Sequence, residues 1–426
     1  MRTLIHQTIF LSASHFFVRA MGFIMRIWLS RELGAQAMGL VELTGSIQML
    51  LITPVVSGLP AAVSRMCDKA EPPQRIRILR LSLAVSLSFS LLVTVCAFCL
   101  RVPLALWLGD IRTLPALLVY LPCIPVLGMS CALNGYFYGC GKPVPPALSE
   151  ILEQIVRLLL CMRLVRLFAG WPMTLRAAIP AAGALAGETA GLLLMLLIAF
   201  RLLFFSRAEG SSRAILSEMA ALALPLTGMR AVSSLMKTAN AAMIPMRLQA
   251  SGLSAQESLA RFGMMNGMMM PVLLLPSFIT CSLCMVAAPE MAKRQTKGRP
   301  QKRLAMRILA AALLVGLAAM CAVYGFAPLF AERLYRQAEL LPLLRRCCVL
   351  VPVMALTQVT GGLMNGLGLQ GKSLRISLAA NFLSVMVMYA LTAQPGLRLY
   401  GAVIAMAAAQ GLTLFCSLRA LSHAIH

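Results

Sequence analysis

Charged residues inside apolar segments are the part of this sequence most able to do chemistry. Arg19 and Arg26 are seven residues apart in one apolar segment, and Arg230 and Lys237 repeat that spacing in another. Seven residues are close to two helical turns, so each pair lies on one helix face. Asn240 extends the second polar stripe. Guanidinium and ammonium groups bind phosphates and other anions, so the spacing predicts an anion-binding surface on two helices.

Carboxylates occur in the same kind of segment. Glu153 precedes Arg157 by four residues, the favourable order for an ion pair on a helix. The sequence supports a structural pair and a role in a binding cavity equally. Glu42 follows the first cationic segment, where it would either neutralise Arg19 or Arg26 or bind a coupling cation.

The composition places these charges in a membrane. The chain has 426 residues, of which 60% are hydrophobic and 12% charged, with a mean hydropathy of +0.84. Soluble proteins are about 25% charged, so we expect an all-α polytopic membrane protein. A charge at the bilayer centre costs at least about 2.5 to 3.5 kcal/mol and normally faces a bundle interior or water. The four cations therefore predict a hydrated cavity with an anionic ligand.

Apolar runs separated by Gly, Pro and charged residues predict twelve membrane-spanning helices in two six-helix bundles. They cover residues 4–30, 37–62, 79–100, 114–138, 145–168, 178–204, 215–246, 258–288, 305–328, 340–367, 373–393 and 399–421. An even number of spans puts both termini on one side. Lys and Arg are about twice as frequent in the loops on that side, so we expect both termini in the cytoplasm of a multi-pass protein.

Two halves of the chain look related. The polar connection at 207–214 predicts a cytoplasmic linker between an N-terminal bundle at 1–206 and a C-terminal bundle at 215–426. LNGYFYGCGK at 133–142 resembles MNGLGLQGK at 364–372, and each ends the fourth helix of its half. Transporters are commonly built from such repeats, with the substrate site between them.

Several kinds of chemistry are not expected. The chain contains 13 Cys, and the C-x-x-C spacings at Cys96 to Cys99 and Cys281 to Cys284 lie in apolar runs without further ligands at metal spacing. We therefore expect no metal site, and no catalytic residue is assigned. The net charge of +24 is explained mainly by cytoplasmic loops, so no nucleic-acid partner is expected.

Four segments resemble the stage V sporulation protein B family. They are VRAMGFIMRIWLSRELGAQAMGLVEL at 18–43, SGLPAAVSRM at 57–66, NGYFYGCGKPVPPALSEILEQIVR at 134–157 and IPMRLQASGLSAQESLARFGMMNGMMMPVLLLPSFIT at 244–280. That family belongs to the polysaccharide transporters of the multidrug/oligosaccharidyl-lipid/polysaccharide flippase superfamily. The resemblance implies a V-shaped alternating-access transporter, not an enzyme, in the bacterial cytoplasmic membrane.

The resemblance also implies export of an undecaprenyl-pyrophosphate-linked glycan or peptidoglycan precursor, similar to lipid II, for the cell wall or spore cortex. Murein lipid II flippases hold the pyrophosphate with arginines of the first helix, and Arg19 and Arg26 occupy that segment. No cofactor is implied, and coupling to membrane potential, Na⁺ or H⁺ stays open. The expected partners are this precursor, membrane lipids and cell-wall or spore assembly proteins.

The chain departs from that pattern in three ways. Arg19 and Arg26 are one residue further apart than the corresponding arginines of murein flippases. Arg261 lies too early in its span to match the arginine in the middle of their eighth helix. The relatives usually have fourteen helices, whereas this sequence predicts twelve. The alternatives are a cation-coupled multidrug exporter of the same superfamily, a polyprenyl-phosphate glycosyltransferase or ligase, and a non-transporting membrane scaffold. The cationic stripes disfavour the exporter, and the lack of a large loop or acidic metal site disfavours the enzyme.

Overall fold

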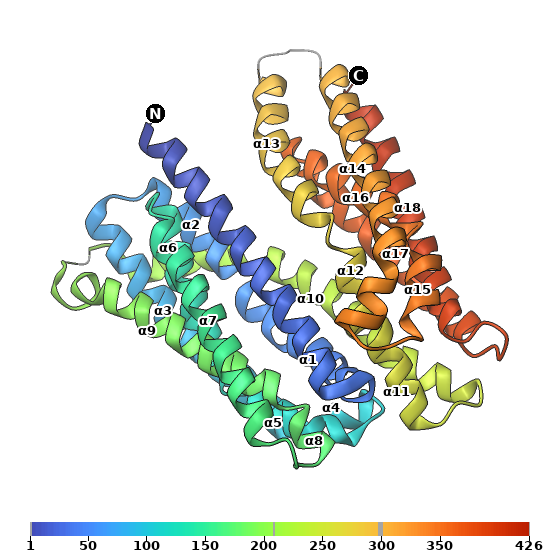
Figure 1. The fold of residues 1–426 in the computed structure, drawn as a ribbon. Coiled ribbons are helices and arrows are strands. Elements are labelled where there is room, and N and C mark those ends of the chain that lie inside the picture. The colour runs from blue at the N-terminus through green and yellow to red at the C-terminus, as the bar shows by residue number, and fades with distance from the viewer. Residues whose placement is uncertain (1, 208, 297–300, 426) are drawn as a thin grey trace. The chain divides into compact units, whose positions relative to one another are not determined.

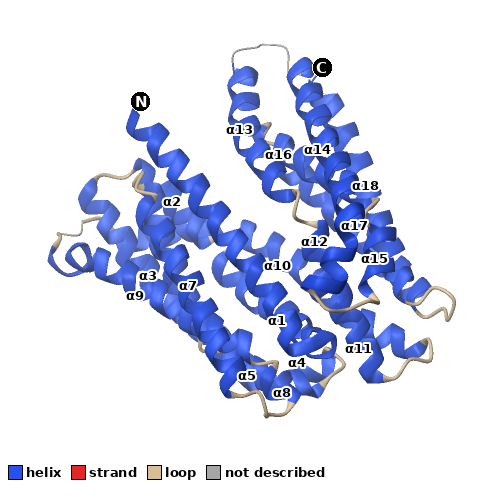
Figure 2. Cartoon of the chain, viewed as in Figure 1, coloured by secondary structure: helices blue, strands red, loops and turns tan. Residues whose placement is uncertain are grey.

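The computed structural model describes residues 2–207, 209–296 and 301–425, and every regular element within them is a helix (Figures 1 and 2). The all-α prediction is confirmed. Contacts divide the chain into two compact units. Unit 1 contains Met1–Met25 and Leu40–Thr238, and unit 2 contains Arg26–Gly39 and Ala239–His426. The predicted boundary at 207–214 coincides with the connection between two long helices and stays a prediction. Ala208 within it lies outside the described residues.

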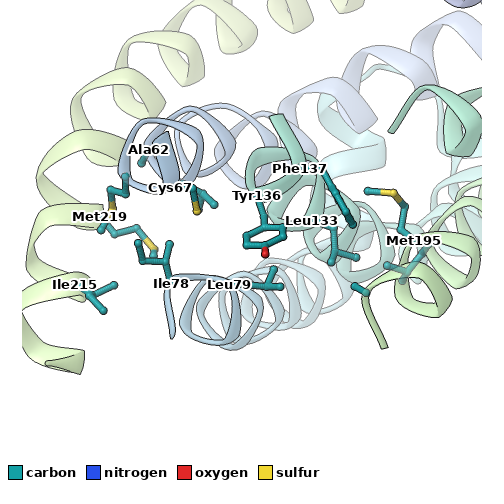
Figure 3. Close-up of a cluster of buried hydrophobic side chains, with 14 residues drawn as sticks. Ala62, Cys67, Ile78, Leu79, Leu133, Tyr136, Phe137, Met195, Ile215 and Met219 are labelled. Carbon is teal, nitrogen blue, oxygen red and sulfur yellow. The ribbon is translucent and has the colours of Figure 1, made fainter. Parts of the chain in front are cut away.

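Unit 1 is built from α1 to α9 and the first part of α10. The helices are α1 (Arg2–Val56), α2 (Leu59–Lys69), α3 (Pro72–Cys99), α4 (Arg101–Trp107), η1 (Ile111–Thr113), α5 (Leu114–Tyr120), α6 (Cys123–Gly139), α7 (Val144–Leu167), α8 (Met173–Arg176), α9 (Ile179–Phe205) and α10 (Ser212–Ala250). Figure 3 shows side chains of α2, α3, α6, α9 and α10 converging in a buried cluster that includes Leu79, Leu133 and Met195. This cluster fixes the start of α10 against α2 and α3.

Unit 2 contains the last part of α10, a short part of α1 and the remaining helices. They are α11 (Ala255–Gly263), the π-helix η2 (Met264–Met269), α12 (Met270–Leu273), α13 (Ser277–Thr296), α14 (Lys302–Pro328), the π-helix η3 (Leu329–Leu334), α15 (Leu340–Cys347), α16 (Leu350–Gly366), α17 (Gln370–Thr392) and α18 (Leu399–Ile425). Its core joins α13, α14, α16 and α18 through residues such as Met291, Ala312 and Leu363.

Several predicted spans are interrupted. Gly34, with φ of 81° and ψ of 169°, separates the first two predicted helices within α1. The predicted helix at 37–62 was wrong as a single element, because α1 ends at Val56 and α2 begins at Leu59. The predicted helices at 114–138, 258–288 and 340–367 are each bent, by 45°, 53° and 54°. Pro122, Pro276 and Pro352 at or near these breaks remove backbone donors and favour the bends.

The described residues contain 7 helices long and apolar enough to cross a membrane, or up to 10 if each bent pair is one span. The prediction of twelve differs for two reasons. The 57-residue stretch Ala13–Lys69 counts once although Gly34 divides it. α7 is not among the helices counted, because its first eighteen residues contain three charged side chains.

The internal repeat is visible in the packing within each unit. α6 packs against α2 and α3, as α16 packs against α13 and α14, and the pair α7 with α9 corresponds to α17 with α18. Gly135 and Gly139 contact α2 so closely that a Cβ on Gly139 would lie 2.5 Å from the Ser64 carbonyl oxygen. Gly362 and Gly366 play the same part against α13. These contacts therefore pair Gly139 with Gly366. The sequence analysis instead aligned Asn134-Gly135 with Asn365-Gly366, which differs from the structural register by four residues.

Candidate functional site

Arg26 is the predicted cation whose surroundings are best defined. Its Nε donates to the carbonyl oxygen of Gly267 and its Nη2 to that of Asn266, both at 3.2 Å. These carbonyls belong to the π-helix η2. Single turns of π-helix are uncommon in proteins, and those that occur often lie at functional sites. All three residues belong to unit 2, so the guanidinium is oriented by the backbone of its own unit.

Close helix packing positions Arg26 against η2. A Cβ on Gly39 would lie 2.2 Å from the Leu259 carbonyl oxygen, and a Cβ on Gly263 would lie 2.1 Å from that of Ala35. Only glycine allows the two backbones to approach so closely. The unit 2 part of α1 therefore lies directly against α11, one turn from the π-helix that accepts the hydrogen bonds of Arg26.

Tyr335 is a residue of this region that the sequence analysis missed. It follows the π-helix η3, is 1% exposed, and lies close enough to Arg26 for electrostatic interaction. Its hydroxyl group has no hydrogen-bond partner among the described residues. A buried phenol without a partner is uncommon. A tyrosine shortly after charged residues at the end of a span was the only signal available in the sequence.

Ionisable side chains line one face of α7 in unit 1. Glu150, Glu153 and Arg157 follow one another at spacings of three and four, so they share a helix face. Glu150 Oε2 lies 3.4 Å from Nδ1 of His15 on α1. The predicted pairing of Glu153 with Arg157 is confirmed, since Glu153 Oε1 accepts a hydrogen bond from Nη2 of Arg157.

A third helix contributes to this ion pair. Glu188 of α9 lies 3.5 Å from the same Arg157 nitrogen, and the side chains of Arg157, Glu153 and Glu188 are 20%, 15% and 14% exposed. α9 approaches through Gly187, where a Cβ would lie 2.6 Å from the carbonyl oxygen of Glu153. When both carboxylates are ionised, the trio carries one net negative charge, which is expensive in a membrane interior.

Three other predicted cations lie on unit 1 and are exposed: Arg19, Arg230 and Lys237. Arg19 lies one turn beyond His15 on α1. α10 is fixed beside the second half of α1, because Thr53 Oγ1 donates to Ser234 Oγ at 3.1 Å and Thr238 Oγ1 to the Ser46 carbonyl at 2.8 Å. Arg230 lies one helical turn before this anchored turn, and Lys237 lies within it, next to Thr238.

Two predicted site residues remain, Glu42 and Asn240. Glu42 is half-buried in unit 1, and Asn240 is half-buried in unit 2, with an Oδ1 that has no partner among the described residues. Of the eight predicted site residues, the structure brings Glu153 together with Arg157. The part of the chain that the structure describes holds no group of three His, Cys, Asp or Glu able to bind a metal ion.

Solved structures show where this arrangement of helices is found. An inward-facing multidrug resistance MATE family transporter of the MOP superfamily superposes with a TM-score of 0.72, covering 95% of this chain and 93% of that one at 17% identity. A MOP superfamily transporter from Pyrococcus furiosus, whose binding pocket has reverse polarity, superposes with a TM-score of 0.64 at 17% identity, covering 99% and 96%. The chain therefore has the fold of MOP superfamily transporters.

Comparisons of sequence are consistent with that fold. The chain is 27% identical over 429 residues to Stage V sporulation protein B of Bacillus subtilis (strain 168), covering 95% of this chain and 81% of the relative. It is 22% identical over 305 residues to Sporulation protein YkvU of the same organism, covering 69% and 66%. The model of the family described as polysaccharide biosynthesis protein matches residues 4–295. The chain belongs to this polysaccharide biosynthesis protein family, as a multi-pass membrane protein.

Proposed function

We propose that this protein is a flippase that exports an undecaprenyl-pyrophosphate-linked glycan or peptidoglycan precursor by alternating access. Family membership and the transporter fold support the class of function. The observation that carries the substrate class is the exposure of Arg19 and Arg230, each near the middle of a predicted span in unit 1. Exposed charges at that depth must be solvated by water or by a ligand, because hydrocarbon cannot do so.

A pyrophosphate fits these cations chemically. Arginine binds phosphate oxygens through two parallel N–H donors, and such charge-assisted bonds are stronger than neutral ones. Lys237 adds a third cation on α10, two turns from Arg230. The sugar and pyrophosphate need shelter from hydrocarbon, whereas the polyprenyl chain stays in lipid. Outward movement of negative charge is favoured by an inside-negative potential, by about 2.3 kcal/mol per charge per 100 mV.

The experiment is native mass spectrometry of the purified protein with undecaprenyl-pyrophosphate-linked disaccharide pentapeptide. We compare the wild type, the Arg19→Ala/Arg230→Ala variant and the conservative Arg19→Lys/Arg230→Lys variant. Hydrogen bonds to charged groups contribute about 1.5 to 3 kcal/mol each, so the alanine variant should bind at least about a hundredfold more weakly. The lysine variant should retain part of the affinity because it keeps the charge.

Arg201→Ala is the matched control, because Arg201 is exposed near the end of α9 and lies outside the two cationic stripes. It should bind as the wild type does. Equal binding by the wild type and the well-folded Arg19→Ala/Arg230→Ala variant would show that the pyrophosphate does not bind at these residues. Absence of binding by all variants would favour a different substrate or a scaffold role, with cell-wall or spore assembly proteins as partners.

A second candidate function is cation-coupled export, and the negative charge of the Arg157 cluster favours it. Glu153 and Glu188 share one guanidinium, and Glu150 lies one turn away beside His15. A bound Na⁺ or a proton would neutralise the excess. Transport by reconstituted protein should then depend on a Na⁺ or H⁺ gradient and lose that dependence in Glu188→Gln. Transport driven equally well by membrane potential alone would exclude coupling at this cluster.

A further inference from the structure

An apolar groove runs along unit 1 between the end of α1, α2, α3 and α10. It has a volume of about 290 Å³ and is lined by Pro54, Val55, Leu59, Val85, Ser86, Phe89, Leu216, Met219, Ala220, Ala223, Leu224 and Thr227. Ten of these twelve side chains are apolar. Leu224 is 68% exposed and Phe89 is 40% exposed, so one long side of the groove is open. The groove is separate from the Arg157 cluster on α7 and α9.

The packing of unit 1 fixes the shape of the groove. Met219 belongs both to the groove and to the buried cluster that joins α10 to α2 and α3 (Figure 3). At the other end, a Cβ on Gly58 would lie 2.2 Å from the Ala223 carbonyl oxygen, so α10 lies directly against the junction of α1 and α2. Small side chains at Ala220 and Ala223 keep the space between these two contacts open.

The groove is about as long as one leaflet of a bilayer is thick. Its lining on α10 extends from Leu216 to Thr227, which corresponds to about 16 Å along the helix. The hydrocarbon core of a bilayer is about 30 Å thick, so the groove matches half of it. A cavity of about 150 Å³ holds one benzene molecule, so this groove has room for a single hydrocarbon chain of about a dozen carbon atoms.

Basic residues surround the end of the groove at which α10 begins. Arg77 donates to Ser212 Oγ and Arg80 to the Ser206 carbonyl oxygen at 2.9 Å, which holds both guanidinium groups beside the start of α10. The Nε atoms of Arg77 and Arg80 have no partner among the described residues. Ser212 precedes Leu216 by one helical turn, so these cations lie within about 6 to 8 Å of the groove along the helices.

The charge around this end is strongly positive. Residues 75–80 and 206–218 contain five arginines and two glutamates. This is the end that the distribution of basic residues places in the cytoplasm. Anionic headgroups of that leaflet attract basic residues, by about 1 kcal/mol for each Lys or Arg near the surface. The groove therefore combines an apolar chain site with a cationic headgroup site at leaflet spacing.

We propose that this groove binds one acyl chain of an anionic phospholipid of the cytoplasmic leaflet, with the lipid phosphate at Arg77, Arg80 and Arg213. The site serves a resident lipid and not the transported one. It is independent of the flippase assignment, because it rests on the groove, its length and its basic end. Lipid bound there bridges α3 and α10 and stabilises unit 1.

The experiment uses the full-length protein in liposomes with phosphatidylglycerol that carries a diazirine in its acyl chain. Crosslinked peptides are identified by mass spectrometry. We expect labels at residues 85–89 and 216–227 in the wild type. Ala220→Phe fills the groove and should reduce this labelling about tenfold, the factor that corresponds to excluding about two methylene groups from burial. Ala221→Phe places the same side chain beside the groove and should label as the wild type does.

Competition identifies the occupant. Unlabelled phosphatidylglycerol should displace the probe, and phosphatidylcholine should displace it less well. Arg77→Gln/Arg80→Gln should reduce this difference, and Arg213→Gln provides an independent reading because Arg213 is exposed and does not anchor the start of α10. Labelling unaffected by Ala220→Phe, or equal competition by the two phospholipids, would overturn the proposal. More effective displacement by undecaprenyl phosphate would assign the groove to the transported lipid instead.

Discussion

Removal of the Arg157 guanidinium tests whether the three-helix ion cluster stabilises unit 1. Arg157→Met keeps much of the side-chain length but leaves Glu153 and Glu188 partly buried without their shared countercharge. Breaking a buried pair by removing one partner costs about 3 to 5 kcal/mol. Because these side chains retain 14% to 20% exposure, the lower end, about 3 kcal/mol, is expected.

That loss corresponds to a large shift in melting temperature. For domains of 150 to 250 residues, about 1 kcal/mol shifts Tm by roughly 2 to 4 °C, so Arg157→Met should lower Tm by about 6 to 12 °C. The measurement is thermal unfolding of the purified protein in detergent, with the folded fraction at each temperature monitored by size-exclusion chromatography. Arg163→Met on the same helix is the control, because Arg163 is exposed. Its Tm should change by less than about 2 °C.

A double mutant separates the charge effect from loss of packing. Arg157→Met/Glu188→Gln removes one of the two uncompensated carboxylates, so it should be more stable than Arg157→Met alone. Lost side-chain packing would not be restored by this second change. A Tm loss below about 2 °C in Arg157→Met, or a double mutant no more stable than the single one, would refute a stabilising charge cluster. The cluster would then be open to a purely functional role.

Further predictions concern the repeat and a thiol at the end of α6. Gly139→Ala and Gly366→Ala should each lower Tm in the same thermal assay. The new methyl group would lie 2.5 Å and 2.6 Å, respectively, from a backbone carbonyl oxygen of the neighbouring helix. Gly371→Ala is the control, because its methyl group would meet nothing within 4 Å. A hydrogen bond with Cys67, aided by Tyr136 and nearby cations, lowers the pKa of Cys140 to about 6. The thiolate should form as pH rises through 6, so alkylation of Cys140 by iodoacetamide, measured by mass spectrometry, should reach half its maximal rate near that pH. Cys67→Ala removes the hydrogen-bond donor and should move this midpoint upward. A wild-type midpoint near 8.5, the pKa of an unperturbed thiol, would contradict this environment.

Local periodicity explains which features of the fold and site could be predicted from the sequence. Apolar runs located most membrane helices, because burial in lipid needs about 20 consecutive apolar residues whatever the tertiary structure. The pair of Glu153 with Arg157 was predictable for a similar reason, since four residues bring side chains together on any α-helix. Helix bends were harder to place, because proline favours a break without fixing where the chain resumes its helix.

Contacts between helices needed the structure. Glu188 joins Arg157 because α7 and α9 pack closely, and neither residue type nor spacing along one helix specifies that neighbour. A usable signal did exist: Gly183, Gly187 and Gly191 recur every four residues on α9, and each would place a Cβ within 3 Å of an atom on α7. Small residues at this spacing are typical of close helix contacts in membranes. Glu188 adjoins that stripe, so its partner could have been sought on the opposing helix.

The first cationic pair shows the limit of reasoning from one helix face. Arg19 and Arg26 share a spacing of seven, yet α1 passes from unit 1 to unit 2 between them. Arg26 is oriented by π-helix carbonyls, whereas Arg19 is exposed on α1 one turn after His15, the residue that pairs with Glu150. Periodicity therefore identified both cations but could not assign their neighbours, which depend on glycine contacts made far along the chain. Two arginines that look equivalent in the sequence are consequently constrained by different parts of the protein, and only Arg26 has an orientation set by backbone acceptors of unit 2.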